Sequence, residues 1–289
     1  MKAKAVGYEE IDKDFIEYPL FEREKIEKTF GIGTRCRLPG CTDTPEIVFI
    51  GAAQTFGRYC QRPFWQIIHE NLGVRTFNLS RPGCSPSFWK ETEEVIKVAN
   101  SSRLLVYQIP SARSTTTSKF KSESGGRVGI TNEGHILDAR QFLEKMLTEN
   151  YDEALQYVSE IRKNYINDTM EFLEKIEVPK IALWISKRPP GLLSRLNNDS
   201  SQISSNLTHR LTARKLMGKF PQYVDSKMMM EIETVVDATV YCVSNSGLPQ
   251  TLRAIDGSDR THKNNYYPSQ EMHLCAAKLL EPVCQSLLV

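Results

Sequence analysis

The sequence predicts a single α/β domain in which about five mostly parallel strands lie between two helical layers, a three-layer α/β/α sandwich of the flavodoxin-like type. Short β-branched and aromatic runs recur along the chain, and segments with helical spacing of apolar residues separate them. Apolar residues make up 40% of the 289 residues, enough to bury one large core. Strands that alternate with helices are typical of a parallel sheet covered on both faces. We expect this domain over residues 45–289, after a polar N-terminal arm, residues 1–44.

The first half of the domain alternates strand and helix. Residues 46–50 form a short β-branched and aromatic run, and residues 63–71 (PFWQIIHEN) carry apolar side chains at helical spacing. A second strand is predicted at 74–79 (VRTFNL), a helix at 89–99, and a third strand at 104–109 (LLVYQI). This order is that of consecutive βα units.

The second half contains a long excursion before the last two strands. Residues 111–134 are rich in Ser, Thr and Gly, which predicts a mobile surface loop. A helical tract from about 136 to 176 follows, and strands are predicted at 181–185 (IALWI) and 238–243 (ATVYCV). Between these strands, the segment 186–220 carries seven Lys and Arg residues against one Asp. We expect this basic insertion to attract an anion.

Charge and cysteine content bound the partners and the compartment. The formal net charge of +2 is too small to indicate nucleic-acid or membrane partners. Seven cysteines without a dense framework, and no apolar run of signal-peptide or membrane-span length, predict a cytoplasmic protein. Cys36 and Cys41 have no second Cys or His pair at zinc spacing nearby, so we expect no metal and no other cofactor. The sequence does not indicate an oligomeric state.

A Gly-bounded turn follows the first predicted strand. In open α/β sheets, ligands bind at the carboxyl ends of the strands, and a helix that begins there offers free N–H groups to an anion. We therefore expect Gly51, Gln54, Thr55 and Arg58 to contribute to a ligand site. The alternative for Thr55 is that it only caps the helix.

This turn, FIGAAQTFG, resembles the Gly-Asp-Ser-x-Thr-x-Gly opening of SGNH (GDSL-type) hydrolases. Aligned on Gly51, Thr55 and Gly57, the Asp of the family falls on Ala52 and its catalytic Ser on Ala53. The side-chain oxygen that attacks an ester is therefore missing. The chain looks like this fold without its standard chemistry.

The turn after the second strand, NLSRPGCSP, resembles the second SGNH block, in which a Gly backbone N–H helps to form the oxyanion hole. Gly83 is the matching residue, and Asn78 and Arg81 are further candidates for ligand binding. Cys84 and Ser85 carry reactive groups, but a nucleophilic thiol needs a lowered pKa and a base, and neither is visible here. The alternative is a Pro/Gly turn that binds no ligand.

The end of the third strand offers a weak match to the third SGNH block, which ends in an Asn that donates to the oxyanion. Gln108 is a possible amide substitute, and Ser111 and Arg113 follow it as candidates for ligand binding. Equally, Gln108 could be hydrogen-bonded inside the edge of the sheet.

The C-terminal stretch NNYYPSQEMH resembles the closing SGNH block, Asp-x-x-His-Pro followed by a helix, with Pro268 setting the register. Asp becomes Asn264 and His becomes Tyr267. A tyrosine, with an ordinary pKa near ~10, cannot act as a base near neutral pH as imidazole does. His273 lies more than one helical turn beyond Pro268, and a packed or solvated histidine is the more frequent case.

The pieces QTFGR, FPQYVD, GLPQTL and YYPSQEMH also resemble an uncharacterised bacterial family of SGNH-like shape that accompanies proteins of cell-surface polysaccharide biosynthesis and sulfotransferases. This resemblance spans about residues 45–285. It implies that the absent triad is a property of the family rather than damage to one member.

Two hypotheses follow. The first is a group-transfer enzyme that moves an acyl or sulfuryl group in surface-polysaccharide modification, through an SGNH-like cleft that lacks Ser-His-Asp and binds an anionic small-molecule donor or a saccharide. The alternative is a non-catalytic pseudoenzyme that binds a saccharide or a partner protein, and an ordinary SGNH esterase is not expected. The catalytic candidates are Thr55, Cys84, Ser85, Tyr267 and His273. The ligand-binding candidates are Gly51, Gln54, Thr55, Arg58, Asn78, Arg81, Gly83, Gln108, Ser111 and Arg113.

Overall fold

The computed structural model describes residues 12–18, 37, 44–122, 128–191 and 206–288, and within the last range it leaves out the side chains of residues 206–210. Five strands form a parallel sheet in the order β2-β1-β3-β7-β8. Their bounds are β1 (Ile47–Ile50), β2 (Thr76–Asn78), β3 (Leu104–Gln108), β7 (Lys180–Ser186) and β8 (Ala238–Val243). Counted along the chain, this is the flavodoxin-like order 2-1-3-4-5. The predicted α/β class, the five strands and their parallel pairing are confirmed.

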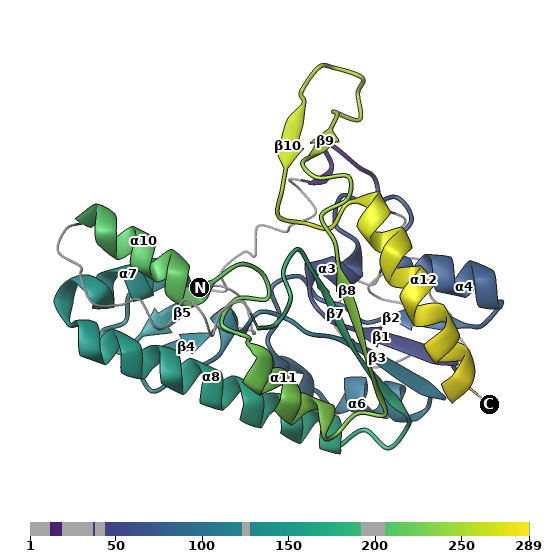
Figure 1. Cartoon of the computed structure of the whole chain (residues 1–289), viewed down its shortest axis with the longest axis horizontal. Coiled ribbons are helices and arrows are strands. Elements are labelled where there is room, and N and C mark those ends of the chain that lie inside the picture. The colour runs from purple at the N-terminus through teal and green to yellow at the C-terminus, as the bar shows by residue number, and fades with distance from the viewer. Residues whose placement is uncertain (1–11, 19–36, 38–43, 123–127, 192–205, 289) are drawn as a thin grey trace.

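Both faces of this sheet are buried, as the two-sided apolar composition of β1 requires. Ile47 and Phe49 point to one face, where they pack against apolar side chains of two helices. Val48 and Ile50 point to the other face, where they belong to a larger cluster with apolar side chains of several helices. The first pair of helices is α4 (Phe64–Leu72) and α12 (Gln270–Leu287). The second group is α5 (Pro86–Glu91), α6 (Glu93–Asn100), α8 (Tyr151–Glu174) and α11 (Ser226–Glu233). The result is the predicted three-layer sandwich (Figure 1).

Two strands of a small antiparallel sheet lie within the segment 111–134, which we expected to be a surface loop, and the third strand follows it. After the short 3₁₀ turn η1 (Ala112–Ser114), strands β4 (Phe120–Ser122), β5 (Val128–Thr131) and β6 (Ile136–Asp138) pair in that order. Phe120 is fully buried and its ring stacks on Phe142 with centroids 5.5 Å apart. Ser and Thr composition concealed this sheet, because each strand is short and its partner lies elsewhere in the segment.

Two helices extend this part of the molecule. The predicted helical tract near 136–176 is divided into α7 (Ala139–Glu149), which opens with a capping box at Asp138, and the long α8. The basic insertion at 186–220 contains α10 (Asn206–Met217), which packs against α7, whereas residues 192–205 lie outside the described part. Within the described ranges, no helix combines the length and the apolarity that crossing a membrane requires.

A projecting hairpin and part of the N-terminal arm complete the fold. Strands β9 (Gln250–Leu252) and β10 (His262–Asn264) form an antiparallel pair that stands out from the sandwich in Figure 1. The described residues of the arm pack here, since Phe15 contacts the ring of His262 at 5.9 Å. Arg37 is buried and donates hydrogen bonds to the carbonyl oxygens of Gly57 and Gln61, both at 2.7 Å. These parts of the arm therefore belong to the packed domain.

Candidate functional site

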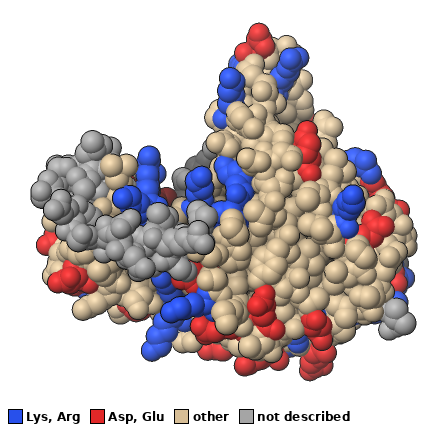
Figure 2. All heavy atoms as spheres, in the orientation of Figure 1, with Lys and Arg blue, Asp and Glu red and all other residues tan. Residues whose placement is uncertain are grey.

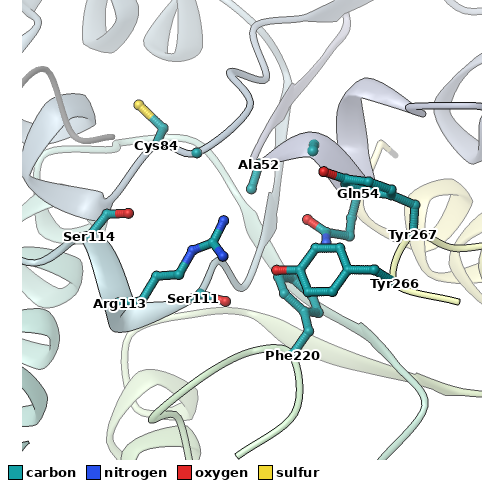
Figure 3. A pocket seen from close by; sticks show the side chains of 11 residues that line it. Ala52, Gln54, Cys84, Ser111, Arg113, Ser114, Phe220, Tyr266 and Tyr267 are labelled. Atoms are coloured by element: carbon teal, nitrogen blue, oxygen red, sulfur yellow. The ribbon is translucent and has the colours of Figure 1, made fainter. Parts of the chain in front are cut away.

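A narrow pocket with a cavity volume of about 20 Å³ lies at the carboxyl edge of the parallel sheet. Segments that follow β1, β2, β3, β7 and β8 all contribute to its wall, as expected for an open α/β sheet. The described lining residues are Ala52, Ala53, Gln54, Gly83, Cys84, Ser111, Arg113, Ser114, Phe220, Tyr266 and Tyr267 (Figure 3).

The pocket brings together six residues of the set predicted from the sequence. They are Gln54, Gly83, Cys84, Ser111, Arg113 and Tyr267. Phe220 and Tyr266 were missed, although both lie in segments, FPQYVD and YYPSQEMH, that carried the sequence resemblance. The aromatic residues of these two segments were the signal that could have found them.

Backbone donors of the short helix α3 (Ala53–Phe56) form one side of the pocket. The N-cap residue is Ala52, whose backbone is extended and whose side chain cannot cap the helix. In the first turn of any helix, the N–H groups have no carbonyl partner within the helix. The N–H groups of Ala53 and Gln54 can therefore donate hydrogen bonds to a bound anion.

The absence of a side chain at Gly51 allows the Ala52 N–H, Thr55 Oγ1 and Gln108 Oε1 to approach one another. A Cβ atom at Gly51 would lie 2.5 Å from Thr55 Oγ1 and 2.7 Å from Gln108 Oε1. Gln108 Oε1 accepts hydrogen bonds from the Ala52 N–H at 2.9 Å and from Thr55 Oγ1 at 3.2 Å. Its amide nitrogen donates to the Ile109 carbonyl oxygen. Gln108 and Thr55 therefore stabilise the turn through buried hydrogen bonds. This fits the alternative given for Gln108 above, an amide that is hydrogen-bonded within the protein.

Arg58 lies behind the pocket and holds Tyr267 at its rim. Only 8% of Arg58 is exposed, and it forms an ion pair with the buried Asp12 at 2.6 Å. Its Nη1 donates to the Tyr267 hydroxyl at 2.6 Å and its Nη2 to the Tyr59 hydroxyl at 3.0 Å. Tyr59 itself has a left-handed backbone, with φ of 60°, and its N–H donates to the Tyr18 hydroxyl at 2.6 Å. Burial raises the pKa of Asp12, against the opposing hydrogen bond and charge of Arg58.

Arg113 supplies a cation to the pocket, opposite the turn after β1. Its guanidinium points into the cavity in Figure 3 and lies 6.0 Å from the ring centroid of Tyr266. The Tyr266 ring meets that of Tyr267 edge to face at 5.0 Å and that of Phe220 at 6.1 Å. The pocket thus combines an arginine, backbone N–H groups and an aromatic wall.

The candidate nucleophiles are not activated. Cys84 lines the pocket, but its thiol is buried, and burial raises its pKa well above the usual range, so the thiolate is not formed near neutral pH. Ser85 is buried and its Oγ shares a hydrogen bond of 2.7 Å with Ser87 Oγ. Neither side chain has an imidazole or carboxylate base as a described hydrogen-bond partner.

His273 lies away from the pocket, packed between the sheet and α4. Its ring stacks on Phe64 at 5.7 Å, and its Nδ1 accepts a hydrogen bond from the Phe64 N–H at 3.3 Å. Complete burial lowers its pKa to about 3. His273 is therefore a neutral packed side chain, the more frequent case that the sequence suggested.

Asn78 and Arg81 are also held outside the described lining of the pocket. Asn78 Oδ1 accepts from the Ser80 N–H at 3.0 Å, and its Nδ2 donates to the Thr55 carbonyl oxygen at 3.4 Å. The guanidinium of Arg81 lies 4.5 Å from the ring centroid of Phe88. The turn after β2 therefore reaches the pocket through Gly83 and Cys84 instead.

The basic insertion is partly structural. Arg188 is buried, donates to the carbonyl oxygens of Lys219 and Val224 at 3.0 and 2.7 Å, and has its pKa lowered to about 10 by burial. Lys187 donates to the side chain of Asn265 at 2.9 Å. Arg195 lies outside the described residues. Lys and Arg side chains nevertheless gather beside the base of the projecting hairpin on the face shown in Figure 2.

Comparisons with known proteins give one partial family match. A family model described as "Domain of unknown function (DUF6473)" matches residues 33–121, less than a third of the chain. No curated protein sequence matches.

Several solved structures are similar to this chain in fold at low sequence identity. A family two carbohydrate esterase from Clostridium thermocellum is 11% identical, with a TM-score of 0.40, over 88% of this chain and 68% of that one. A lipase, Lip_vut3, from a goat rumen metagenome is 10% identical, with a TM-score of 0.41, over 83% and 97% of the two chains. A catalytic mutant of Axe2, an acetylxylan esterase from Geobacillus stearothermophilus, is 12% identical, with a TM-score of 0.39, over 83% and 94%. The chain is similar to these proteins in arrangement, and their activities are statements about them alone.

Proposed function

We propose that the protein is a group-transfer enzyme that binds the anionic part of an acyl or sulfuryl donor in this pocket and acts in surface-polysaccharide modification. The observation that carries the proposal is that Arg113 and the first turn of α3, with Ala53 and Gln54, line one cavity at the carboxyl edge of the sheet. Donors arranged in advance around a developing negative charge stabilise it more strongly than water does.

The transfer that fits such a pocket is a single displacement. A hydroxyl oxygen of the acceptor forms a bond to the acyl carbon or to the sulfur of the donor. The bond to the leaving group breaks, the electron pair departs with the leaving group, and the hydroxyl proton passes to the leaving group or to solvent. This route needs no enzyme nucleophile, which agrees with an alanine at position 53. Arg113 and the N–H groups would stabilise the negative charge of the transferred or departing group.

The polysaccharide context is supported by the sequence resemblance and by the aromatic wall. Tyr266 is 37% exposed and, with Phe220, offers an apolar face at the side of the pocket. Aromatic rings of this kind pack against the C–H groups of a sugar while polar groups hold its substituents. An anionic donor or an acidic saccharide would contact both Arg113 and the aromatic residues Phe220 and Tyr266.

One observation favours a second candidate, a non-catalytic protein that binds an anionic saccharide. Among the described lining residues there is no carboxylate and no imidazole, and the thiol of Cys84 stays protonated near neutral pH. A general base for the acceptor hydroxyl is therefore not part of that lining. In this candidate the same pocket binds its ligand and no bond is broken.

Thermal shift and calorimetric titration with acyl-CoA, sulfate-donor nucleotides, nucleotide sugars and acidic oligosaccharides test the proposal on the wild type, Arg113→Ala and Arg81→Ala. We expect a donor to raise the melting temperature of the wild type and of Arg81→Ala, whose arginine stacks on Phe88, but not of Arg113→Ala. Equal shifts in all three proteins would remove the proposal.

Mass spectrometry of the acceptor then separates the two candidates. A transferred acyl or sulfuryl group that appears only with wild-type protein supports the enzyme. If acidic oligosaccharide binds the wild type but not Arg113→Ala, and no donor binds either protein, the result supports the non-catalytic binding protein.

A further inference from the structure

We propose that a second cavity, a polar groove between α5 and α8, binds a neutral saccharide segment. The groove has a cavity volume of about 490 Å³ and is larger than the pocket described above. Its described lining residues are Ser87, Phe88, Lys90, Glu91, Thr116, Lys121, Ser122, Asn164, Asn167, Asp168 and Glu171. The proposal that the groove binds a saccharide depends only on the groove itself. The further proposal that the groove is the acceptor subsite rests on the proposed function.

Hydroxyl and amide groups make up a large part of the groove wall. Ser87 is the second residue of α5. Thr116 and Ser122 come from the segment around β4. Asn164 and Asn167 are three residues apart on α8 and therefore lie on the same helix face. Asn164 Nδ2 donates to the Thr116 carbonyl oxygen at 3.0 Å, which leaves its Oδ1 as an acceptor, and the exposed Asn167 offers both donors and an acceptor. A ligand with many hydroxyl groups matches this inventory.

The charges of the groove nearly balance, with one carboxylate in excess, which argues against an anionic ligand. Lys90 Nζ lies 2.6 Å from Asp168 Oδ1 and 2.9 Å from Glu171 Oε2. Lys121 and Glu91 add one charge of each sign. With three carboxylates and two lysines in the described lining, the groove has no excess of positive charge to attract an anion. This distinguishes it from the pocket that contains Arg113.

One aromatic side chain gives the groove a place for a sugar ring. Phe88 is half-buried and is the single aromatic residue among the described lining residues. The guanidinium of Arg81 lies over its ring at 4.5 Å, and Trp89 packs edge to face against it at 4.8 Å. These contacts fix the ring orientation. A wall with one aromatic ring and many polar groups suits a saccharide better than an apolar ligand.

The groove and the pocket are lined by neighbouring residues of the same two segments. Cys84 and Ser114 line the pocket, while Ser87 and Thr116 line the groove. Even a fully extended chain spans at most about 11 Å over three residues and about 7 Å over two. The two cavities are therefore close enough for a short oligosaccharide in the groove to present its end to the pocket. This arrangement makes the groove the acceptor subsite of the proposed transfer.

Isothermal titration calorimetry with neutral oligomers of glucose, xylose, mannose and N-acetylglucosamine tests the inference on the full chain. The groove variant is Asn164→Ala combined with Asn167→Ala, and the control is Lys163→Ala, an exposed residue of the same helix outside the described lining. We expect at least one oligomer to bind the wild type and the control equally. The double variant should bind about tenfold more weakly, as expected for the loss of one or two hydrogen bonds.

The outcomes separate this inference from the proposed function. If no oligomer binds the wild type, or if the double variant binds as well as the control while retaining its melting temperature, the groove is not a saccharide site. If a neutral oligomer binds wild type and Arg113→Ala equally while no anionic donor binds, the groove stands and the proposed function fails. If donors bind through Arg113 and no oligomer binds, the reverse holds.

Discussion

Arg58 donates a hydrogen bond of 2.6 Å from Nη1 to the hydroxyl of Tyr267, and the same guanidinium lies 4.8 Å from the centroid of the Tyr267 ring. The two residues are 209 positions apart in the chain. One follows β1 and the other precedes α12, so this contact joins the first and last loops of the carboxyl edge. The rim of the pocket therefore depends on how Arg58 is held, and Asp12 holds it.

Replacing Asp12 with Asn should destabilise the fold by about 3 kcal/mol, because it leaves the buried guanidinium of Arg58 without its counter-charge. Urea unfolding measures this loss. Asp14→Asn, at an exposed position two residues away, serves as the control and should change stability by less than about 0.5 kcal/mol. Equal effects of the two substitutions would show that the Asp12–Arg58 pair contributes no stability.

Gly51→Ala should cost about 2 kcal/mol or more, because the new Cβ would lie 2.5 Å from Thr55 Oγ1. The substitution should also weaken donor binding, since Thr55 and Gln108 support the turn that carries Ala53. Gly191→Ala is the matched control, because a Cβ there meets nothing within 4 Å. A variant at Gly51 as stable as the one at Gly191 would contradict the close approach.

His273 should make stability depend on pH. Its pKa is lowered from 6.5 to about 3 in the fold, so the unfolded chain binds a proton at a higher pH than the folded one. The contribution is fully present above about pH 6.5 and is lost as the pH falls towards 3, on the order of 5 kcal/mol in all.

His273→Gln keeps an acceptor near the Phe64 N–H but does not titrate. The difference in unfolding free energy between wild type and this variant should shrink as the pH falls through that window. A difference that stays constant would mean that His273 does not remain neutral in the fold.

Cys84 should resist alkylation in the folded protein even though it lines the pocket. Its thiol is buried, and burial raises its pKa well above the usual range. Cys275, which is half-buried on α12, should react first with iodoacetamide at neutral pH. Peptide mass mapping over time measures the two rates. Labelling of Cys84 at the rate of Cys275 would restore it as a candidate nucleophile.

The parallel sheet was predictable because its signal is local. β1 consists of Ile47, Val48, Phe49 and Ile50, all buried, and a run that is apolar on both faces predicts a strand inside a covered sheet. The turn after β1 was predictable for a related reason. Gly51 is required there because the side chain of Thr55, four residues later, approaches its Cα too closely to leave room for a Cβ atom.

The surroundings of the pocket were not predictable because they depend on distant partners. Asp12 lies in a charged stretch of the arm, and nothing in that stretch marks it as the partner of Arg58, 46 residues later. Gln108 looked like an oxyanion donor by its position after β3, but the Ala52 N–H and Thr55 Oγ1 both donate to its oxygen inside the protein. Similarly, the Ser/Thr-rich composition near Phe120 concealed strands whose pairing is set between segments.

The hydrogen bond from Arg58 to Tyr267 limits how a Ser-His-Asp arrangement could be built into this pocket. Ala53→Ser alone supplies an oxygen without a base. Tyr267→His removes the hydroxyl that Arg58 contacts, and Asn264→Asp adds a carboxylate at a position only 6% exposed. The changes at Tyr267 and Asn264 therefore bring a structural cost before any catalytic gain, and Ala53→Ser alone brings no base.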